Sequence, residues 1–214
     1  MGRSNSGVKM EISSISIKNE GYIYCKSKFY SVHDGLSHYS CYTFSRGVNK
    51  LVGEIDSGVW AISYLLSMYK HSPEDFVLFD PPEVTVNNKV ISLNELSEYS
   101  CYIDNLCPLF SMNKSVKEHI IQGLEQSKLN YSYNDIKNLF HIDGMRFEEP
   151  LKNVGNESFK AMSAIGFSHK KEIFCFPWLS NNRFLSYHKN ITGTLQTLKE
   201  LDKIVIVPVG ISTI

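Results

Sequence analysis

The sequence predicts an α/β fold with a mainly parallel core sheet and an appended N-terminal antiparallel β-layer. Early segments alternate apolar and polar side chains, which is typical of strands with one buried face. The later segments "EIFCF" and "DKIVIVPV" are continuously apolar, as interior parallel strands are, and they alternate with helical patterns. The stretch "KLVGEIDSGVWAISYLL" joins a buried strand, a glycine turn and a helix. Together these patterns indicate strands first and an α/β core afterwards.

The N-terminal half supplies most of the expected strands. In "MEISSISIKN", isoleucines alternate with polar residues, and "GVNKLV" is a short buried run that ends at Gly53. From Gly58 onward, large apolar side chains recur at helical spacing. Asn87 and Asn88 between two short alternating runs predict a hairpin turn. The expected strands are residues 10–19, 22–32, 47–53, 76–80 and the hairpin 83–93.

The C-terminal half alternates helices and strands. Ser115 followed three residues later by Glu118 forms a capping box, which predicts a helix start. Either Ser132 or Asn134 caps the next helix, and Pro177 ends a buried strand. The expected helices are 115–126, 132–142, 156–169 and 191–201, and the expected strands are 98–104, 171–179 and 202–211.

Composition limits the function classes. A length of 214 residues suits one α/β domain over residues 1–214, and the 22 basic residues balance 22 acidic ones, so nucleic acid is not an expected partner. Five scattered cysteines and seven dispersed histidines favour a reducing cytosol and argue against a structural metal site. No apolar run is long enough to span a bilayer. Residues 1–9 are polar, which is typical of a tag or a disordered tail.

Gly53 and Gly58 have the spacing of a phosphate-binding loop, GxxxxGK[ST]. Val59 and Trp60 stand where that motif has its lysine and its hydroxyl. Taken alone, two glycines at this spacing favour a plain strand-to-helix turn over a phosphate site. The neighbouring segments change this interpretation of the fold, although not of the chemistry.

Three segments follow one another in a specific order. They are "FSRGVNKLVGEIDSGVWAISYLLSMY", the hairpin "EVTVNNKVISLNEL" and "YSCYIDNLCPLFSMNKSVKEHIIQGL". In this order they resemble the Walker A segment, the small hairpin and the Q-loop segment of ATP-binding cassette (ABC) transporter nucleotide-binding domains. The chain resembles that family over nearly its full length. The resemblance implies a P-loop NTPase-like fold, with a helical subdomain holding the Q-loop and signature regions at about residues 100–165.

The chemical residues of the family are replaced at the matching positions. In an active cassette, a lysine contacts the terminal phosphates, the next hydroxyl holds Mg²⁺, and backbone amides cradle the rest. Val59 and Trp60 stand at those two positions, and Asp104 replaces the Q-loop glutamine. Phe176 and Pro177 align with the Walker B aspartate and the catalytic glutamate. The resemblance therefore implies a degenerate nucleotide site, with no catalytic residue and no metal ligand set, at Gly53, Ser57, Gly58, Val59, Trp60 and Asp104.

At the switch and signature motifs, the functional residues of the family are replaced as well. Pro208 or Val209 aligns with the switch histidine, and Asn156 and Glu157 align with glycines of the signature. Glu157 would face the phosphates of a nucleotide bound across a dimer. Because every electrostatic contribution to phosphoryl transfer is missing, we do not expect this chain to hydrolyse ATP by itself.

These features predict a catalytically inactive ABC-type homologue that serves as a scaffold or a regulatory subunit. By resemblance its partners are a second copy, an active cassette or a membrane permease, in a cytoplasmic location with peripheral attachment at the inner face of the membrane. Peptide export or immunity is a setting in which such a subunit would work. The surface that would face the partner is the groove from Asp104 to Ser115, including Leu109 and Phe110.

Two alternatives remain open. In the first alternative, the chain is an ATP-binding subunit that binds ATP through backbone amides and an aromatic ring, while its partner supplies the catalytic groups. Otherwise it is a soluble small-molecule binder that reuses the cleft, with an apolar pocket bordered by Trp60, Phe176 and Trp178. No resident cofactor is expected in either case, and ATP is the ligand left open.

Overall fold

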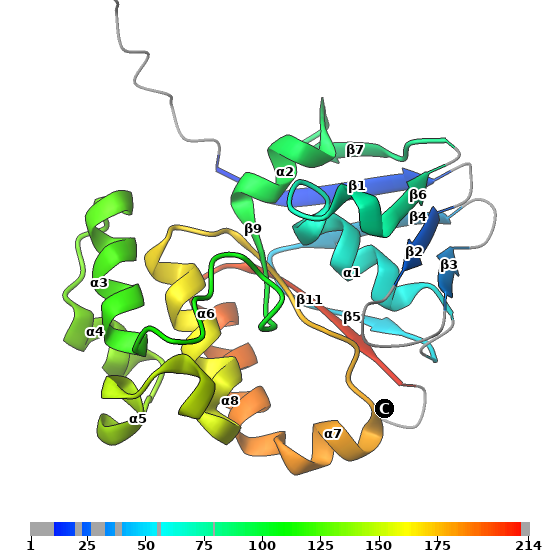
Figure 1. The fold of residues 1–214 in the computed structure, drawn as a ribbon. Helices are drawn as coiled ribbons and strands as arrows, with labels where there is room; N and C mark the ends of the chain where they lie inside the picture. The colour runs from blue at the N-terminus through cyan, green and yellow to red at the C-terminus, as the bar shows by residue number, and fades with distance from the viewer. Residues whose placement is uncertain are drawn as a thin grey trace, which may run out of the picture.

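The structure is a computed structural model that describes residues 11–19, 23–26, 33–36, 40–54, 57–78 and 80–210. The described strands form one parallel and one antiparallel four-stranded sheet and a smaller three-stranded sheet (Figure 1). The expected tail at residues 1–9 and most of the second candidate strand lie outside the described residues.

The parallel sheet forms the centre of the molecule (Figure 1). Its strand order is β5-β11-β10-β9, and all three neighbouring pairs are parallel. The side chains of β9, β10 and β11 are all buried, which explains why β10 and β11 are continuously apolar. The mainly parallel core sheet is therefore confirmed. The strands are β5 (Gly47–Val52), β9 (Ser100–Tyr102), β10 (Ile173–Cys175) and β11 (Ile204–Val209).

The antiparallel layer comes from the first hundred residues. Its order is β4-β1-β7-β8, and a smaller sheet has the order β3-β2-β6. Asn87 and Asn88 have φ values of 49° and 64°, so both central residues of the hairpin lie in the left-handed region. The predicted hairpin is confirmed. The strands are β1 (Ser14–Asn19), β2 (Ile23–Lys26), β3 (His33–Leu36), β4 (Ser40–Ser45), β6 (Phe76–Leu78), β7 (Glu83–Val86) and β8 (Lys89–Ile91).

Helix α1 (Val59–Met68) is buried over its whole length. It contacts β9, β10 and β11 of the parallel sheet and β2 and β3 of the small sheet. A helix enclosed on all sides needs apolar side chains all round, which the sequence "VWAISYLLSM" supplies. The Ser63 hydroxyl is satisfied by donating to the carbonyl of Phe176 at 2.6 Å. The glycine loop before α1 is therefore followed by a core helix, as predicted.

Four helices gather beside one end of the parallel sheet, away from the antiparallel strands (Figure 1). Ser115 and Ser132 cap the first two with reciprocal side-chain and backbone bonds, which confirms the Ser115 cap and selects Ser132 over the alternative Asn134. A short 3-10 stretch joins the third helix to the fourth. The helices are α3 (Val116–Ser127), α4 (Tyr133–Leu139), α5 (Gly144–Glu148) and α6 (Ser158–Ser168), and the 3-10 turns are η2 (Leu151–Asn153) and η3 (Gly155–Glu157).

Helices α3 and α6 approach closely at Gly123. A Cβ placed on Gly123 would lie 2.2 Å from Ser168 Oγ, 2.7 Å from His169 Cδ2 and 2.9 Å from the Ser168 backbone carbon. A backbone atom cannot move aside as a flexible side chain can. Glycine is therefore required by the close crossing of the two helices.

Three helices were not predicted: α2 (Leu93–Tyr99), α5 and α7 (Asn181–Ser186). In α2, Ser92 caps the helix by accepting from the Glu95 amide at 3.1 Å, and Leu96 is fully buried. The helix takes residues 98 and 99 from the strand expected at 98–104, which starts only at Ser100. The last helix, α8 (His188–Glu200), begins three residues before the expected start. None of the helices in the described ranges is long and apolar enough to cross a membrane.

Candidate functional site

The loop after β5 lies at the carboxyl edge of the parallel sheet and is curled tightly around Gly53. The Gly53 amide donates to the Val209 carbonyl at 3.0 Å, which ties the loop to β11. A Cβ on Gly53 would lie 2.1 Å from Ser57 Oγ and 3.1 Å from Val59 Cγ1. Gly58 has a φ of 88°, a left-handed value that favours glycine. The backbone path therefore favours glycine at position 58, and Gly53 leaves room for the Ser57 and Val59 side chains.

Ser57 is used by the loop itself. Its amide and its hydroxyl both donate to the Glu54 carbonyl, at 3.0 Å and 2.6 Å. These two bonds close the turn between the strand and α1. The hydroxyl is therefore engaged in holding the loop together.

Helix α1 begins at this loop with Gly58 as its N-cap. Among the residues that the structure describes, no side chain caps the helix there, and no acidic residue stands in its first turn. The first amides of a helix and its dipole favour an anion. Val59, 5% exposed, adds no charge to this position. Any anion at the loop would therefore be held by backbone groups.

Trp60 points into the core. Its indole Nε1 donates to the Tyr102 hydroxyl at 3.2 Å, and its ring stacks on Tyr64 at 5.2 Å. Tyr64 in turn donates to Asp75 Oδ2 at 2.8 Å. Burial raises the pKa of both tyrosines well above the usual value, so both hydroxyls stay protonated. This aromatic cluster joins the first turn of α1 to β9.

The aromatic side chains of the segment after β10 are also taken up by contacts within the chain. Phe176 is fully buried and stacks on Phe159 with ring centroids 5.9 Å apart. Trp178 is half-buried, and its indole donates to the Gly53 carbonyl at 3.1 Å. Trp60, Phe176 and Trp178, expected to border an apolar pocket, are thus engaged in the core and in the loop backbone. This arrangement does not favour the small-molecule hypothesis.

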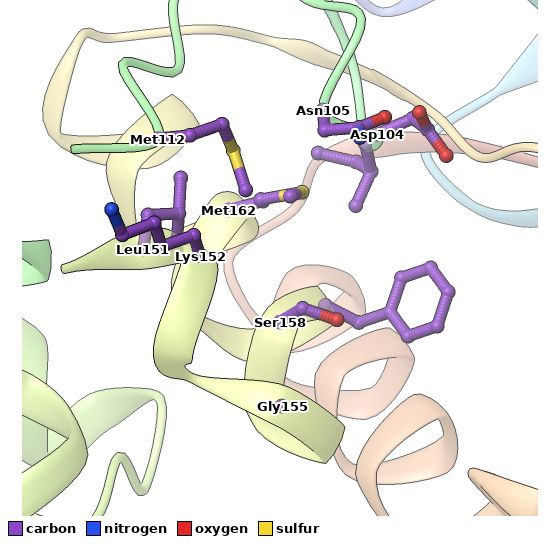
Figure 2. Close-up of a pocket in the computed structure, with 10 residues that line it drawn as sticks. Asp104, Asn105, Met112, Leu151, Lys152, Gly155, Ser158 and Met162 are labelled. Atoms are coloured by element: carbon purple, nitrogen blue, oxygen red, sulfur yellow. The ribbon is translucent and has the colours of Figure 1, made fainter. Parts of the chain in front are cut away.

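A cavity of about 240 Å³ lies between the loop after β9 and the segment from η2 to α6 (Figure 2). Met112 and Met162 reach toward one another from these two sides, with Asp104 and Asn105 at one end. Lys152 at the other end donates to Asn113 Oδ1 at 3.0 Å. We call this cavity the docking pocket; its lining residues are Ile103, Asp104, Asn105, Met112, Leu151, Lys152, Gly155, Ser158, Phe159 and Met162.

The two walls of the docking pocket are joined by backbone bonds. The Lys152 amide donates to the Met112 carbonyl at 3.1 Å, and the Leu151 amide donates to the Lys114 carbonyl at 2.9 Å. An isolated antiparallel bridge links Ser115 with Pro150. The pocket is therefore built on two segments about forty residues apart that pair like a short ladder.

Comparison with known proteins rests on structure alone, because the sequence matches no protein-family model and no curated protein. The first similar structure is a Pyrococcus furiosus protein described as an ABC transporter ATP-binding protein. The likeness has a TM-score of 0.61 at 15% identity, covering 92% of this chain and 90% of the other. The fold is that of an ABC nucleotide-binding domain. The fold class expected from the resemblance is thus confirmed.

A second ABC structure gives the same fold. It is a bacterial Atm1-family ABC exporter with ATP bound, with a TM-score of 0.57 at 12% identity. The likeness covers 97% of this chain but only 36% of the exporter. The chain therefore matches a part of that longer protein in fold. The matching of single residues with the motifs of the ABC family stays a prediction.

Within this ABC fold, the expected site residues divide into two groups. Gly53, Ser57, Gly58 and Val59 share the glycine loop. Asp104 lies in the docking pocket after β9, which is at the opposite edge of the sheet from β5. Its carboxylate accepts from the Leu106 amide at 3.3 Å.

The residues of the segment expected to face a partner, Asp104 to Ser115, differ in whether they line the docking pocket. Leu109 is half-buried, whereas Phe110 is only 5% exposed and supports the segment from inside. Ser115 is the N-cap of α3. Asp104, Asn105 and Met112 are the residues of this segment that line the pocket, and Met112 faces α6 across it. The role of Met112, and that of Lys152, was missed because no local pattern brings the two segments together.

Glu157, expected near a nucleotide across a dimer, is engaged within the helical cluster. Its Oε2 accepts from the Asp143 amide at 3.1 Å, and its Oε1 lies 3.3 Å from Lys160 Nζ. These contacts attach η3 to the start of α5. The carboxylate therefore has a structural role inside the chain.

Proposed function

We propose that this chain is a non-hydrolysing ABC-type subunit that acts by binding a partner, as a scaffold or a regulatory subunit. The observation that carries the proposal is the state of the sheet edge at the glycine loop. Val59 and Trp60, which follow the loop, and Phe176, which follows β10, are buried apolar side chains. The Ser57 hydroxyl and the Trp178 indole are engaged with loop carbonyls.

Phosphoryl transfer depends almost entirely on positioning and charge stabilisation. It needs a cation on the transferred phosphate, a ligand for Mg²⁺ and a group that orients water. Val59 provides no cation, Trp60 no hydroxyl, and Phe176 with Pro177 no carboxylate. Removing one such group slows catalysis by orders of magnitude, so removing all of them supports an inactive subunit.

The docking pocket supports a role in contact. Its Met112, Met162 and Phe159 side chains give an apolar floor, and methionines adapt to differently shaped apolar partners. Asp104 and Lys152 place opposite charges at its two ends, which would orient a segment with a matching dipole. A cytoplasmic loop of a permease or the surface of a second cassette fits this description. Export or immunity with attachment at the inner face of the membrane belongs to the same proposal.

An ATPase assay on the purified chain tests the absence of hydrolysis. We expect phosphate release with Mg²⁺ and ATP to equal that of a blank without protein. The Val59→Lys variant serves as a control that restores the cation alone and should stay inactive. Hydrolysis that co-elutes with the wild-type chain and exceeds the Val59→Lys variant contradicts the proposal.

A second candidate is an ATP-binding subunit whose partner supplies the catalytic groups. It is favoured by the α1 N-terminus, where Gly58 has a φ of 88° and the first helical amides point toward the glycine loop. Isothermal titration with ATP distinguishes the two candidates. Binding in roughly the micromolar range that is lost in Gly58→Ala would favour the second. No heat of binding would favour the scaffold.

A further inference from the structure

One buried imidazole fixes the start of the wall that carries Met112. His119 lies in the first turns of α3 and is 2% exposed. Its Nε2 accepts from the Ser111 amide at 2.9 Å, and its Nδ1 lies 2.8 Å from the Ser115 carbonyl oxygen. A backbone amide can only donate and a carbonyl can only accept. The neutral tautomer with its proton on Nδ1 is therefore the form that satisfies both contacts.

The His119 contact acts directly on the docking pocket. Ser111 immediately precedes Met112, whose side chain lines the pocket and whose carbonyl accepts from Lys152 at 3.1 Å. The Lys114 amide also donates back to the Ser111 carbonyl at 3.1 Å. The Ser111 amide is thus held by a side chain, whereas the rest of the wall is held by backbone bonds.

The charges around His119 come from three elements. Lys114 in the preceding loop and Glu118 on α3 act on the ring in opposite directions, and His169 lies at the end of α6. Burial is the main cause of the lowered pKa of His119, with Lys114 adding to it. The pKa of His169 is lowered to about 4, mainly by burial and then by Lys171. Both rings are therefore neutral near pH 7.

We propose that neutral His119 is a pH-sensitive latch that positions the Ser111–Met112 wall and thereby keeps the docking pocket in shape. The partner side of this inference rests on the proposed docking function. Protonation would place an N–H on Nε2 facing the Ser111 N–H, so two donors would oppose one another and the amide would lose its acceptor. The ring would also become a buried cation beside Lys114. Acid thus releases the wall, and neutral pH restores it.

Two variants separate the latch from the packing of the ring. His119→Gln keeps an acceptor at the reach of Nε2 and cannot gain a proton between about pH 5 and about pH 8. His119→Phe keeps the ring shape and removes both hydrogen bonds. His169 is present in both variants, and its pKa of about 4 places its own titration below the tested range.

The test is nuclear magnetic resonance of the full chain with ¹³C-labelled methionine methyl groups and ¹⁵N amides. From about pH 7.5 to about pH 5, the wild-type Met112 methyl resonance should shift, while that of Met68 in the core helix α1 stays in place. Exchange of the Ser111 amide, corrected for its intrinsic pH dependence, should rise about tenfold. His119→Gln should show neither change, and His119→Phe should have the released-wall signals already at the higher pH.

A wild-type Met112 resonance that does not change with pH overturns the latch, and so does an equal shift in His119→Gln. If His119→Phe fails to fold, the comparison of wild type with His119→Gln decides alone. No partner and no nucleotide enters these measurements. A failed latch would therefore leave the docking function standing, and a failed docking function would leave the latch standing.

Discussion

The glycine loop and the docking pocket lie at opposite edge strands of one sheet and differ in what holds them. Near the loop, Trp60 in α1 and Phe176 after β10 are core residues, and Ser57 serves the backbone turn. At the docking pocket, half-buried and exposed groups such as Asp104 and Lys152 surround a cavity. In this ABC fold the residues that follow the glycine loop, Val59 and Trp60, belong to the core, whereas the docking pocket opens on the helical side. Stability should therefore depend on the first region, and partner binding on the second.

The largest effect is expected from Phe176→Ala. Phe176 is fully buried and stacked on Phe159, so truncation leaves a cavity in the core. We expect a loss of about 3–5 kcal/mol in the free energy of unfolding, measured by urea denaturation. Lys152→Ala in the docking pocket is the matched control, because an exposed lysine should change stability by less than about 0.5 kcal/mol. Equal losses of unfolding free energy in Phe176→Ala and Lys152→Ala would contradict the expected difference between the core and the docking pocket.

Gly123→Ala probes the helical side. The added Cβ would meet the Ser168 backbone, so we expect a loss of about 1–3 kcal/mol and a displaced α6. Gly193→Ala is the control, since no atom lies within 4 Å of a Cβ there and alanine is the better helix former. Thermal unfolding should show opposite shifts for the two variants. Stabilisation by Gly123→Ala would show that the crossing is looser than described.

Trp60→Phe sharpens the picture of the loop. An aromatic ring stays, but the smaller phenyl group loses the bond from Nε1 to the Tyr102 hydroxyl and leaves a void in the core, so we expect a loss of about 1–3 kcal/mol. Chemical denaturation measures this loss, with Trp178→Phe as the comparison, because that indole donates to the loop carbonyl of Gly53. If Trp60→Phe instead produced ATP binding, the indole would be an obstacle in a nucleotide site.

Mild acid should give the smallest and most gradual effect. His119 and His169 have lowered pKa values in the folded chain, so the unfolded chain binds more protons. Stability is complete above about pH 6.5 and falls as pH drops toward the folded pKa values. His119→Gln should reduce the slope of unfolding free energy against pH above about pH 5. A slope that the variant leaves unchanged would assign the effect to His169 or to other groups.

The sequence was sufficient where structure depends on near neighbours. The Ser115 and Ser132 caps, the Asn87–Asn88 turn and the apolar strand β11 each follow from short patterns. Helix α2 was missed although Ser92 and Glu95 have the spacing of a helix start, because the hairpin pattern before it favoured strand. The strand pattern of the hairpin and the helix start at Ser92 overlap there, and the burial of Leu96 favours the helix.

What the sequence alone determined is the α/β class, the order of most elements and the uncharged character of Val59, Trp60, Phe176 and Pro177. Only the tertiary structure decided where these side chains point. It turned Trp60 toward Tyr102, brought Met112 beside Met162 and placed His119 under Ser111. Propensities and caps act within a few residues, whereas a pocket is made by contacts between segments distant in the chain. Such contacts depend on packing and on the satisfaction of buried polar groups, which no single segment encodes.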